Sequence, residues 1–304
     1  MTNTFTIRHP REGRHNGQMP RCRLARVTVL SALLATGVVS PPVAAQPTRT
    51  PDVHFVPTPM DVVEAMLAVA RVSKQDRLYD LGSGDGRIVI TAAKRLGTRG
   101  IGIDIDPQRI TESRRNADTA GVTQLVEFRQ ADLFETDLRQ ASVVTLYLLP
   151  ALNVKLRPKL FAELRPGSRV VSHAFHMGDW EADSTLNVNG RSVFYWVMPS
   201  KVDGTWTLRM GSGGSERTYN LRLAQNYQRL TGTATAGGHT LSVDSARVVG
   251  DSVIFTLADT TRGAAGSQER MRFAGRLNSG AMAGSASGGA HGSAPWRASR
   301  ATGQ

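Results

Sequence analysis

The sequence is poor in the residues on which several functional classes depend. It contains one cysteine, Cys22, among 304 residues. Disulfide frameworks, cysteine-rich zinc sites and a thiol nucleophile are therefore excluded for the rest of the chain. The formal net charge is +12, yet the basic residues form no runs and are not interleaved with aromatic side chains. We therefore expect no nucleic-acid partner.

No apolar run is long enough to span a bilayer comfortably, since a spanning helix needs about 20 apolar residues. The longest candidate, residues 27–39, follows three arginines and precedes a small-residue stretch that ends near Ala45. This order predicts a signal peptide over residues 1–45, cleaved near Ala45, and a periplasmic or secreted mature chain. Residues 1–45 carry six arginines and one acid, hence +5 of the total charge.

Two alternatives to a cleaved leader are open. The apolar run is also compatible with an uncleaved membrane anchor, or with an ordinary N-terminal helix. Residues 1–18 are long and polar for the start of a signal peptide, so Met19 is a second candidate start beside Met1. Membrane contact is expected only through an uncleaved leader.

After a Pro- and Thr-rich linker at residues 46–57, strands and helices alternate. Thr58 is expected to cap a helix with Pro59 at its first position. The expected strands are 77–81, 100–105, 126–130, 142–149 and 167–173, and the expected later helices are 87–96, 107–120 and 152–164, the last kinked by Pro158. This alternation predicts an α/β fold, a Rossmann-like doubly wound parallel sheet, over residues 58–200. A further strand at 191–199 is expected to run antiparallel.

The pattern changes after Pro199. Short alternating segments recur over residues 201–304, separated by Gly, Ser, Asp and Asn. They predict a small antiparallel β-barrel or sandwich, with Trp206, Tyr219 and Tyr227 in its core. Such a barrel could also hold one apolar ligand. Residues 280–293 are so rich in Gly, Ala and Ser that part of them is expected to be a flexible loop.

The central motif lies between the first strand and the next helix. Residues 80–86 read D-x-G-x-G-x-G. Gly82, Gly84 and Gly86 allow a sharp turn and a close approach of a ligand to the backbone. A dinucleotide-binding loop reads G-x-G-x-x-G, but the sixth position from Gly82 is Arg87. The spacing is instead that of enzymes that use S-adenosylmethionine.

Two more acids follow the next two strands. Asp104 lies 22 residues beyond Gly82, at the end of the second strand, where a carboxylate can accept hydrogen bonds from both ribose hydroxyls. Asp132 follows the third strand and can accept from an adenine amino group. The alternative interpretation is that these are turn and cap aspartates, for which Asp has a strong preference.

These motifs carry a family resemblance over residues 54–200. The chain resembles class I S-adenosylmethionine-dependent methyltransferases. More narrowly, residues 55–59 (F-V-P-T-P) and 80–90 (D-L-G-S-G-D-G-R-I-V-I) are similar to a family of small protein-lysine methyltransferases. The eukaryotic members of that family modify mitochondrial inner-membrane proteins.

The resemblance implies which residues hold the cofactor. Asp80 would contact its methionine end, Asp104 the ribose and Asp132 the adenine, and residues 55–59 would lie over it. The expected cofactor-binding residues are Phe55, Pro57, Thr58, Asp80, Gly82, Ser83, Gly84, Gly86, Asp104, Ile105 and Asp132.

Candidates for the acceptor side are Tyr147 and His173, at the ends of the fourth and fifth strands. Either could orient or deprotonate an acceptor, and either could equally be a structural side chain with its polar atoms satisfied. Residues 146–150 read L-Y-L-L-P, where many N- and DNA-methyltransferases carry an Asn/Asp-Pro-Pro-Tyr/Phe motif. His173 and His176 lack a third ligand at suitable spacing, so no metal is expected.

The function expected from the sequence is methyl transfer from S-adenosylmethionine to an amine, a protein lysine first and a small molecule next, by a monomer. The alternative is an exported binding protein with a vestigial adenosyl-ligand site and recognition by the β-domain. That alternative arises because S-adenosylmethionine is made in the cytosol, whereas the leader predicts export.

Overall fold

The computed structural model describes residues 52–212, 216–259, 270–288 and 292–301. The expected leader and most of the expected linker lie outside these residues. Within the described part of the chain, no helix has the length and apolar content needed to cross a membrane.

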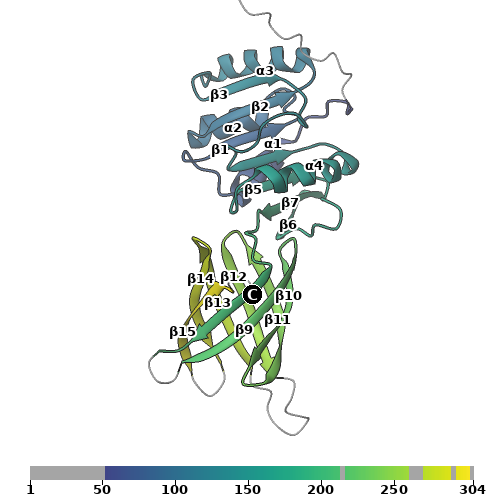
Figure 1. The fold of residues 1–304 in the computed structure, drawn as a ribbon. Helices are drawn as coiled ribbons and strands as arrows, with labels where there is room; N and C mark the ends of the chain where they lie inside the picture. Colours follow the sequence, from purple (N-terminus) through teal and green to yellow (C-terminus); the bar gives the residue numbers. More distant parts are fainter. Residues whose placement is uncertain (1–51, 213–215, 260–269, 289–291, 302–304) are drawn as a thin grey trace, which may run out of the picture. The chain divides into compact units, whose positions relative to one another are not determined.

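The first part is a seven-stranded sheet flanked by helices (Figure 1). Its strands are β1 (Arg77–Leu81), β2 (Arg99–Asp104), β3 (Val126–Gln130), β4 (Val143–Leu146), β5 (Arg169–His173), β6 (Ser184–Val188) and β7 (Arg191–Val197). The order is β3-β2-β1-β4-β5-β7-β6. Strands β1 to β5 are parallel, and β7 runs antiparallel to both of its neighbours. The doubly wound sheet and its antiparallel strand at 191–199 are therefore confirmed.

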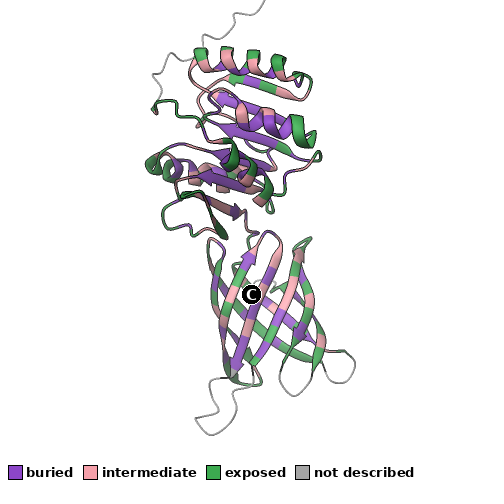
Figure 2. Ribbon diagram, turned by 180° about the vertical axis from the view of Figure 1, so that it is seen from behind, coloured by how far each residue is buried: buried purple, intermediate pink, exposed green. Residues whose placement is uncertain are grey.

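Helices cover both faces of this sheet, which is why its strands are apolar on both sides. Alternate residues of one strand, such as Leu78 and Tyr79, belong to two separate apolar cores. One core includes side chains of α1 (Met60–Val69), α2 (Arg87–Leu96) and α3 (Pro107–Ala120), and the other includes those of α4 (Pro150–Glu163). Figure 2 shows the buried residues following the strands between these helices.

Local sequence explains where these helices begin and end. The side chain of Asp106 caps α3 by accepting from the backbone N–H of Gln108 at 2.7 Å, and Pro107 occupies the first position. Helix α2 begins after Gly86 and ends before Gly97, both in the left-handed conformation.

Several details differ from expectation. Thr58 is not the N-cap of α1, because the helix begins at Met60 and Pro59 occupies the cap. Strand β4 ends at Leu146 instead of residue 149, so Tyr147 lies in the loop beyond it. Strand β6 was not predicted, since its alternating residues are only half-buried or exposed. Pro158 lies inside α4 without ending it.

The strand order places a ligand site at one edge of the sheet. From β1 the chain proceeds to β2 and β3 on one side of the sheet. It then returns to add β4 on the other side of β1, so the strand order reverses between β1 and β4. In doubly wound sheets, ligands bind at the carboxyl ends of the strands at such a reversal. The glycine loop follows β1, and Tyr147 follows β4.

The second part is a closed antiparallel barrel, which confirms the first of the two expected architectures. Its strands are β8 (Gly204–Met210), β9 (Arg217–Asn226), β10 (Arg229–Ala236), β11 (His239–Val249), β12 (Ser252–Asp259), β13 (Arg270–Asn278), β14 (Ala281–Ser287) and β15 (Ser293–Arg300). Each strand pairs with its neighbour in sequence, and β15 pairs with β8 to close the barrel. The boundary expected at residue 200 falls between β7 and β8.

Aromatic and aliphatic side chains fill the barrel interior. The rings of Phe255 and Phe273 stack with centroids 4.8 Å apart, and Trp296 meets both edge-on. Trp206 and Tyr219 are buried in this core as expected, but Tyr227 is only half-buried and does not belong to it. A barrel of eight strands is just wide enough for such side chains to fill.

Part of residues 280–293 was expected to be a flexible loop. Residues 281–287 of this stretch form β14, and residues 289–291 lie outside the described residues. The small residues of β14 serve close packing. A Cβ on Gly275 would lie 2.5 Å from the Trp296 ring, and one on Gly284, its partner across the strands, would lie 2.0 Å from the carbonyl oxygen of Ala274.

Candidate active site

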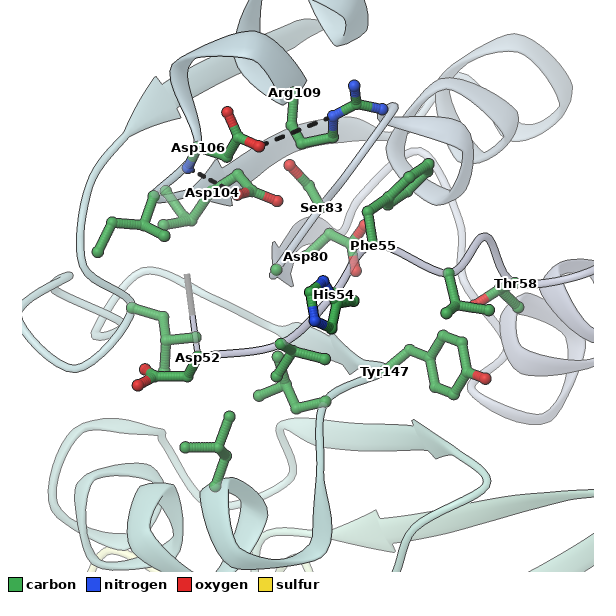
Figure 3. Close-up of a pocket in the computed structure, with 18 of the residues that line it drawn as sticks. Asp52, His54, Phe55, Thr58, Asp80, Ser83, Asp104, Asp106, Arg109 and Tyr147 are labelled. Atoms are coloured by element: carbon green, nitrogen blue, oxygen red, sulfur yellow. Dashed lines mark hydrogen bonds and ion pairs between the residues drawn. The ribbon is translucent and has the colours of Figure 1, made fainter. Parts of the chain in front are cut away.

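A cavity of about 520 Å³ lies at the carboxyl ends of the central strands (Figure 3). Its lining comes from the glycine loop, from the ends of β1 and β2, from the loops after β3, β4 and β5, and from residues 52–58, which we call the covering segment. The cavity therefore occupies the place that the strand order predicts.

The glycine loop has positions where a side chain would not fit, and glycine at these positions allows its shape. The backbone N–H groups of Gly82 and Ser83 donate to the carbonyl oxygen of Ile103 at 2.8 and 2.9 Å, which ties the loop to β2. Gly84 has φ +53°, and a Cβ there would lie 2.2 Å from the ring of Phe55. The loop therefore requires glycine at this position for both conformation and space.

Asp104 joins the loop to the end of β2. Its two carboxylate oxygens accept from the backbone N–H groups of Gly84 and Asp106 at 2.8 and 2.9 Å. Burial raises the pKa of the Asp104 carboxyl, and these hydrogen bonds oppose the rise. Each oxygen keeps a further lone pair, so a ligand with two hydroxyl groups can still donate to this carboxylate.

Asp80, at the end of β1, is 2% exposed. Burial raises its pKa to about 7, the negative charges of Asp104 and Asp85 add to the rise, and a hydrogen bond from Thr145 opposes it. The Thr145 hydroxyl donates to Asp80 Oδ1 at 2.7 Å. A positively charged ligand beside Asp80 would favour its ionised form.

The covering segment is fastened to the loop by contacts that the sequence did not indicate. The Arg87 guanidinium pairs with Asp85 and donates from Nη1 to the carbonyl oxygen of Thr58 at 2.9 Å. The Arg109 guanidinium lies over the ring of Phe55, 4.8 Å from its centroid. Figure 3 shows the segment crossing the cavity with Phe55 directed toward Arg109.

Tyr147 and Phe175 form an aromatic wall on the side of β4 and β5. Their ring centroids are 6.2 Å apart in a stacked arrangement. Behind Tyr147 lies the buried His173 ring, with centroids 3.9 Å apart. A hydrogen bond of 3.3 Å joins His173 Nδ1 and Thr58 Oγ1. Burial lowers the pKa of His173, with the charge of Arg191 acting in the same direction, so the imidazole is neutral at neutral pH.

The loop after β5 is held in an unusual conformation. Ala174 has φ +65°, which a residue with a side chain rarely adopts. The buried Asn153, in the first turn of α4, donates through Nδ2 to Ser172 Oγ and to the carbonyl oxygen of Phe175, both at 3.1 Å. Asn153 therefore fixes the backbone that presents Phe175 to the cavity.

The structure brings most of the residues expected at the site together. The lining includes Phe55, Pro57, Thr58, Asp80, Gly82, Ser83, Asp104, Ile105, Asp132 and Tyr147. Gly84 and Gly86 shape the loop without lining the cavity, and His173 lies behind Tyr147 and Thr58. The roles assigned to these residues stay predictions. Lining residues that sequence reasoning missed include Asp52, His54, Asp85, Arg87, Asp106, Arg109, Leu149 and Phe175.

Asp132 is both a lining residue and a turn aspartate. Its Oδ1 accepts from the backbone N–H of Phe134 at 2.8 Å, in the loop after β3. This local bond is what the alternative interpretation of the sequence predicted. The two interpretations are compatible, because a carboxylate held by its own turn still faces the cavity.

One buried polar atom beside the cavity lacks a hydrogen-bond partner among the described residues. Ser83 lines the cavity, and its buried Oγ has no hydrogen-bond partner in the described part of the chain. Buried hydroxyls are normally bonded, so this is the state expected of a group whose partner is a ligand. Together with Asp104 and the glycine loop, Ser83 fits an adenosyl compound such as S-adenosylmethionine. No group of three or more potential metal ligands occurs among the described residues.

The alternating glycines after β1 and the acid at the end of β2, in a sheet of this order, define a class I S-adenosylmethionine-dependent methyltransferase. The profile of the ANTKMT methyltransferase domain matches residues 80–184. A protein-lysine N-methyltransferase from Saccharolobus islandicus is 45% identical over 148 residues, which are 48% of this chain and 92% of that protein. The chain therefore belongs to the ANTKMT methyltransferase family and is an S-adenosylmethionine-dependent enzyme.

Two further similarities extend this comparison. The adenine nucleotide translocase lysine N-methyltransferase of Mus musculus is 35% identical over 159 residues, 52% of this chain and 66% of that protein. A solved structure of an RNA methyltransferase from Salinibacter ruber in complex with S-adenosylhomocysteine is 57% identical, with a TM-score of 0.48. The matched region covers 48% of this chain and 96% of the Salinibacter ruber chain.

Proposed function

We propose that the enzyme transfers a methyl group from S-adenosylmethionine to lysine side chains of a protein. The observation that carries this proposal is the similarity to proteins named as lysine N-methyltransferases, at 45% identity over 92% of one relative. The cavity supports it, because the aromatic wall of Tyr147 and Phe175 and the side chains of Leu149 and Leu152 offer an apolar passage for an alkyl amine. A small-molecule amine is the second acceptor class.

The proposed chemistry asks for binding and alignment more than for a reactive side chain. When bound, S-adenosylmethionine supplies a methyl group already activated by its sulfonium. Asp104 and Ser83 would hold the adenosyl part, and the covering segment would exclude water from above it. The lysine nitrogen then forms its bond to the methyl carbon as the bond from carbon to sulfur breaks.

The lysine must first lose its proton, because the ammonium has no lone pair. The apolar side chains of Leu149, Leu152 and Phe175 desolvate the amine, which lowers its pKa and releases the proton to solvent through the mouth of the cavity. Tyr147 lines the cavity and would contact the amine. His173 does not line the cavity, so we assign it a positioning role, in which its ring and its bond to Thr58 fix Tyr147.

The test uses the full chain, S-adenosylmethionine and peptides with a single lysine, paired with the same peptides in which arginine replaces it. We expect a mass gain of whole methyl groups on the lysine peptides alone, with a slower rate for Tyr147→Phe. Transfer to small amines or to RNA, and to no lysine peptide, would overturn the lysine acceptor while leaving the enzyme class intact.

The alternative of a binding protein with a vestigial site finds no support. The chain belongs to a methyltransferase family, and the glycine loop, Asp80 and Asp104 all take part in one cavity.

We also propose that the chain is exported and cleaved near Ala45, on the basis of the leader in the sequence. N-terminal sequencing of protein recovered from the producing cells tests this. A start near residue 46 supports export, whereas an intact leader in the membrane fraction indicates an anchor.

A further inference from the structure

The described residues leave six large apolar side chains exposed, and three of them line the cavity. They are Phe55, Val56, Met60, Leu96, Leu149 and Val154. Single exposed apolar residues need no explanation. A group of them at one place marks an interaction site.

Three of the six line the cavity and two more lie in segments next to its lining, and we call these five the apolar rim. Phe55, Val56 and Leu149 line the cavity itself. Met60 begins α1, two residues after Thr58, which also lines the cavity. Val154 lies one turn into α4, beside the loop after β5, where a Cβ on Gly178 would be 3.2 Å from its Cγ2.

Leu96 is the exception and provides a natural control. It is the last residue of α2, a helix of ten residues that starts at the glycine loop. With a rise of 1.5 Å per residue, it lies about 15 Å from that loop, toward the opposite edge of the sheet.

The charged residues of the cavity indicate which kind of side chain can enter it past the apolar rim. Six carboxyl groups line the cavity, those of Asp52, Asp80, Asp85, Asp104, Asp106 and Asp132. The lining has two guanidinium groups. Arg87 pairs with Asp85, and Arg109 pairs with Glu112 and lies 4.0 Å from Asp106, so carboxyl groups still outnumber the cations. An acidic cavity attracts a cationic side chain and repels an anionic one.

A lysine that enters this cavity brings its neighbours onto the rim. Its ammonium is carried on a stem of only four carbons, so the polypeptide on either side of it must lie against the residues around the mouth. Those residues are apolar and exposed in the free enzyme. Large apolar side chains next to the lysine would remove this surface from water, and polar ones would not.

We propose that the apolar rim is the docking surface for the acceptor polypeptide and selects lysines flanked by large apolar side chains. The inference rests on the proposed lysine acceptor and specifies its sequence context. A bilayer is a poorer partner, because the exposed carboxylates of Asp52 and Asp61 lie beside the rim and would repel anionic lipid.

The experiment compares two peptides with one central lysine, flanked on both sides either by Leu and Val or by Ser. The full chain is assayed as wild type, as Met60→Ser with Val154→Ser, and as Leu96→Ser. We expect kcat/KM at least tenfold higher for the apolar peptide with wild type and with Leu96→Ser. In the double variant this ratio should fall below threefold, through a higher KM for the apolar peptide. Binding of S-adenosylmethionine, measured by calorimetry, reports that each variant is folded.

Each other outcome overturns a defined statement. Equal rates on the two peptides would remove the rim as a selecting surface and leave the lysine acceptor in place. No transfer to either peptide by a chain that binds S-adenosylmethionine would remove the lysine acceptor and this inference with it. In sedimentation with vesicles of phosphatidylglycerol and phosphatidylethanolamine, binding lost in the double variant and kept in Leu96→Ser would assign the rim to lipid instead.

Discussion

The α/β domain buries polar side chains beside its apolar cores, whereas the described barrel strands bury apolar side chains alone. Among the described residues, fourteen polar or charged ones are buried. Twelve of these lie between Thr58 and His173, and none lies in a described barrel strand. Seven of the twelve lie at or beside the cavity edge, namely Thr58, Asp80, Ser83, Thr145, Asn153, Ser172 and His173.

This difference separates stability from function. Burying a polar group costs free energy unless a hydrogen bond compensates it. The barrel avoids that cost, as a stable scaffold would. The α/β domain accepts it where a ligand and its positioning residues need polar contacts. Substitutions at four positions test this contrast.

The largest effect is expected for Phe255→Ala in the barrel core. Phe255 is fully buried and stacked on Phe273. Truncation should lower the free energy of unfolding by about 3–5 kcal/mol, as for other buried Phe-to-Ala changes. Urea denaturation measures this loss. Affinity for S-adenosylmethionine should not change at urea concentrations below the unfolding transition. A weaker affinity there would contradict the separation of barrel stability from cofactor binding.

Asp104→Ala should weaken cofactor binding, whereas Phe255→Ala should lower stability. It removes a carboxylate that can receive ribose hydroxyls and that now accepts from Gly84 and Asp106. Hydrogen bonds to a charged group contribute about 1.5–3 kcal/mol, so affinity for S-adenosylmethionine should fall roughly 10- to 150-fold by calorimetry. Asp137→Ala, at an exposed carboxylate, is the matched control and should bind normally. Equal binding by both variants would contradict the ribose assignment.

Cofactor binding should weaken in mild acid because of Asp80. With a folded pKa of about 7, against the ordinary 3.8, this carboxyl holds a proton below neutral pH. The positively charged cofactor favours the ionised form, so affinity at pH 6 should be lower than at pH 8 by about tenfold at most.

The same shift affects the stability of the free protein, with a definite sign. Between about pH 4 and 7 the folded state holds a proton that the unfolded state has lost. The contribution of Asp80 is therefore fully present below pH 4 and is lost as the pH rises through 7. Asp80→Asn should remove both dependences over this range. A variant that keeps the slope of affinity between pH 6 and 8 would assign the titration to another group.

The smallest effect is expected for Asn153→Ala. Loss of its amide leaves the Phe175 carbonyl oxygen without its Asn153 donor and relaxes the strained backbone at Ala174. Because the cavity wall near the acceptor moves and the glycine loop does not, KM for a lysine peptide should rise a few fold with cofactor affinity unchanged. Restored kinetics in Asn153→Gln, which keeps an amide donor, would support positioning. A fall in cofactor affinity would argue for general loosening of the fold.

The sequence allowed prediction of the parts of the site that follow a strand directly. Asp80 and Asp104 end β1 and β2, and parallel strands align their carboxyl ends at one edge. Local spacing was therefore enough to bring these two acids together. Tyr147 directly follows β4 and lines the cavity, although β4 proved shorter than expected.

Side chains that reach the cavity from elsewhere carried no such signal. Phe175 faces it only because Ala174 adopts φ +65° and Asn153 holds the loop. Arg109 reaches it by lying over Phe55, more than fifty positions away in the chain. Both depend on tertiary contacts, which neither periodicity nor a short motif encodes.

The barrel shows a second limit. Composition favoured a flexible loop for part of residues 280–293, because glycine and alanine commonly mark linkers, and it did not indicate that residues 281–287 form β14. In the barrel, Gly284 of this stretch and Gly275 opposite it leave no room for a Cβ, because Trp296 and the facing strand occupy the space. The same residues are thus compatible with disorder and with tight packing, and only the partner strand decides between them.

The covering segment has a consequence for the order of events in catalysis. Phe55 lies against Gly84 of the glycine loop, while Phe55 and the adjacent Val56 belong to the rim. A polypeptide bound to Val56 would keep the covering segment closed over the cavity, so S-adenosylmethionine could not enter and S-adenosylhomocysteine could not leave. We therefore expect a compulsory sequence, in which S-adenosylmethionine binds first and S-adenosylhomocysteine departs last. Inhibition by S-adenosylhomocysteine would then compete with the cofactor and not with the acceptor.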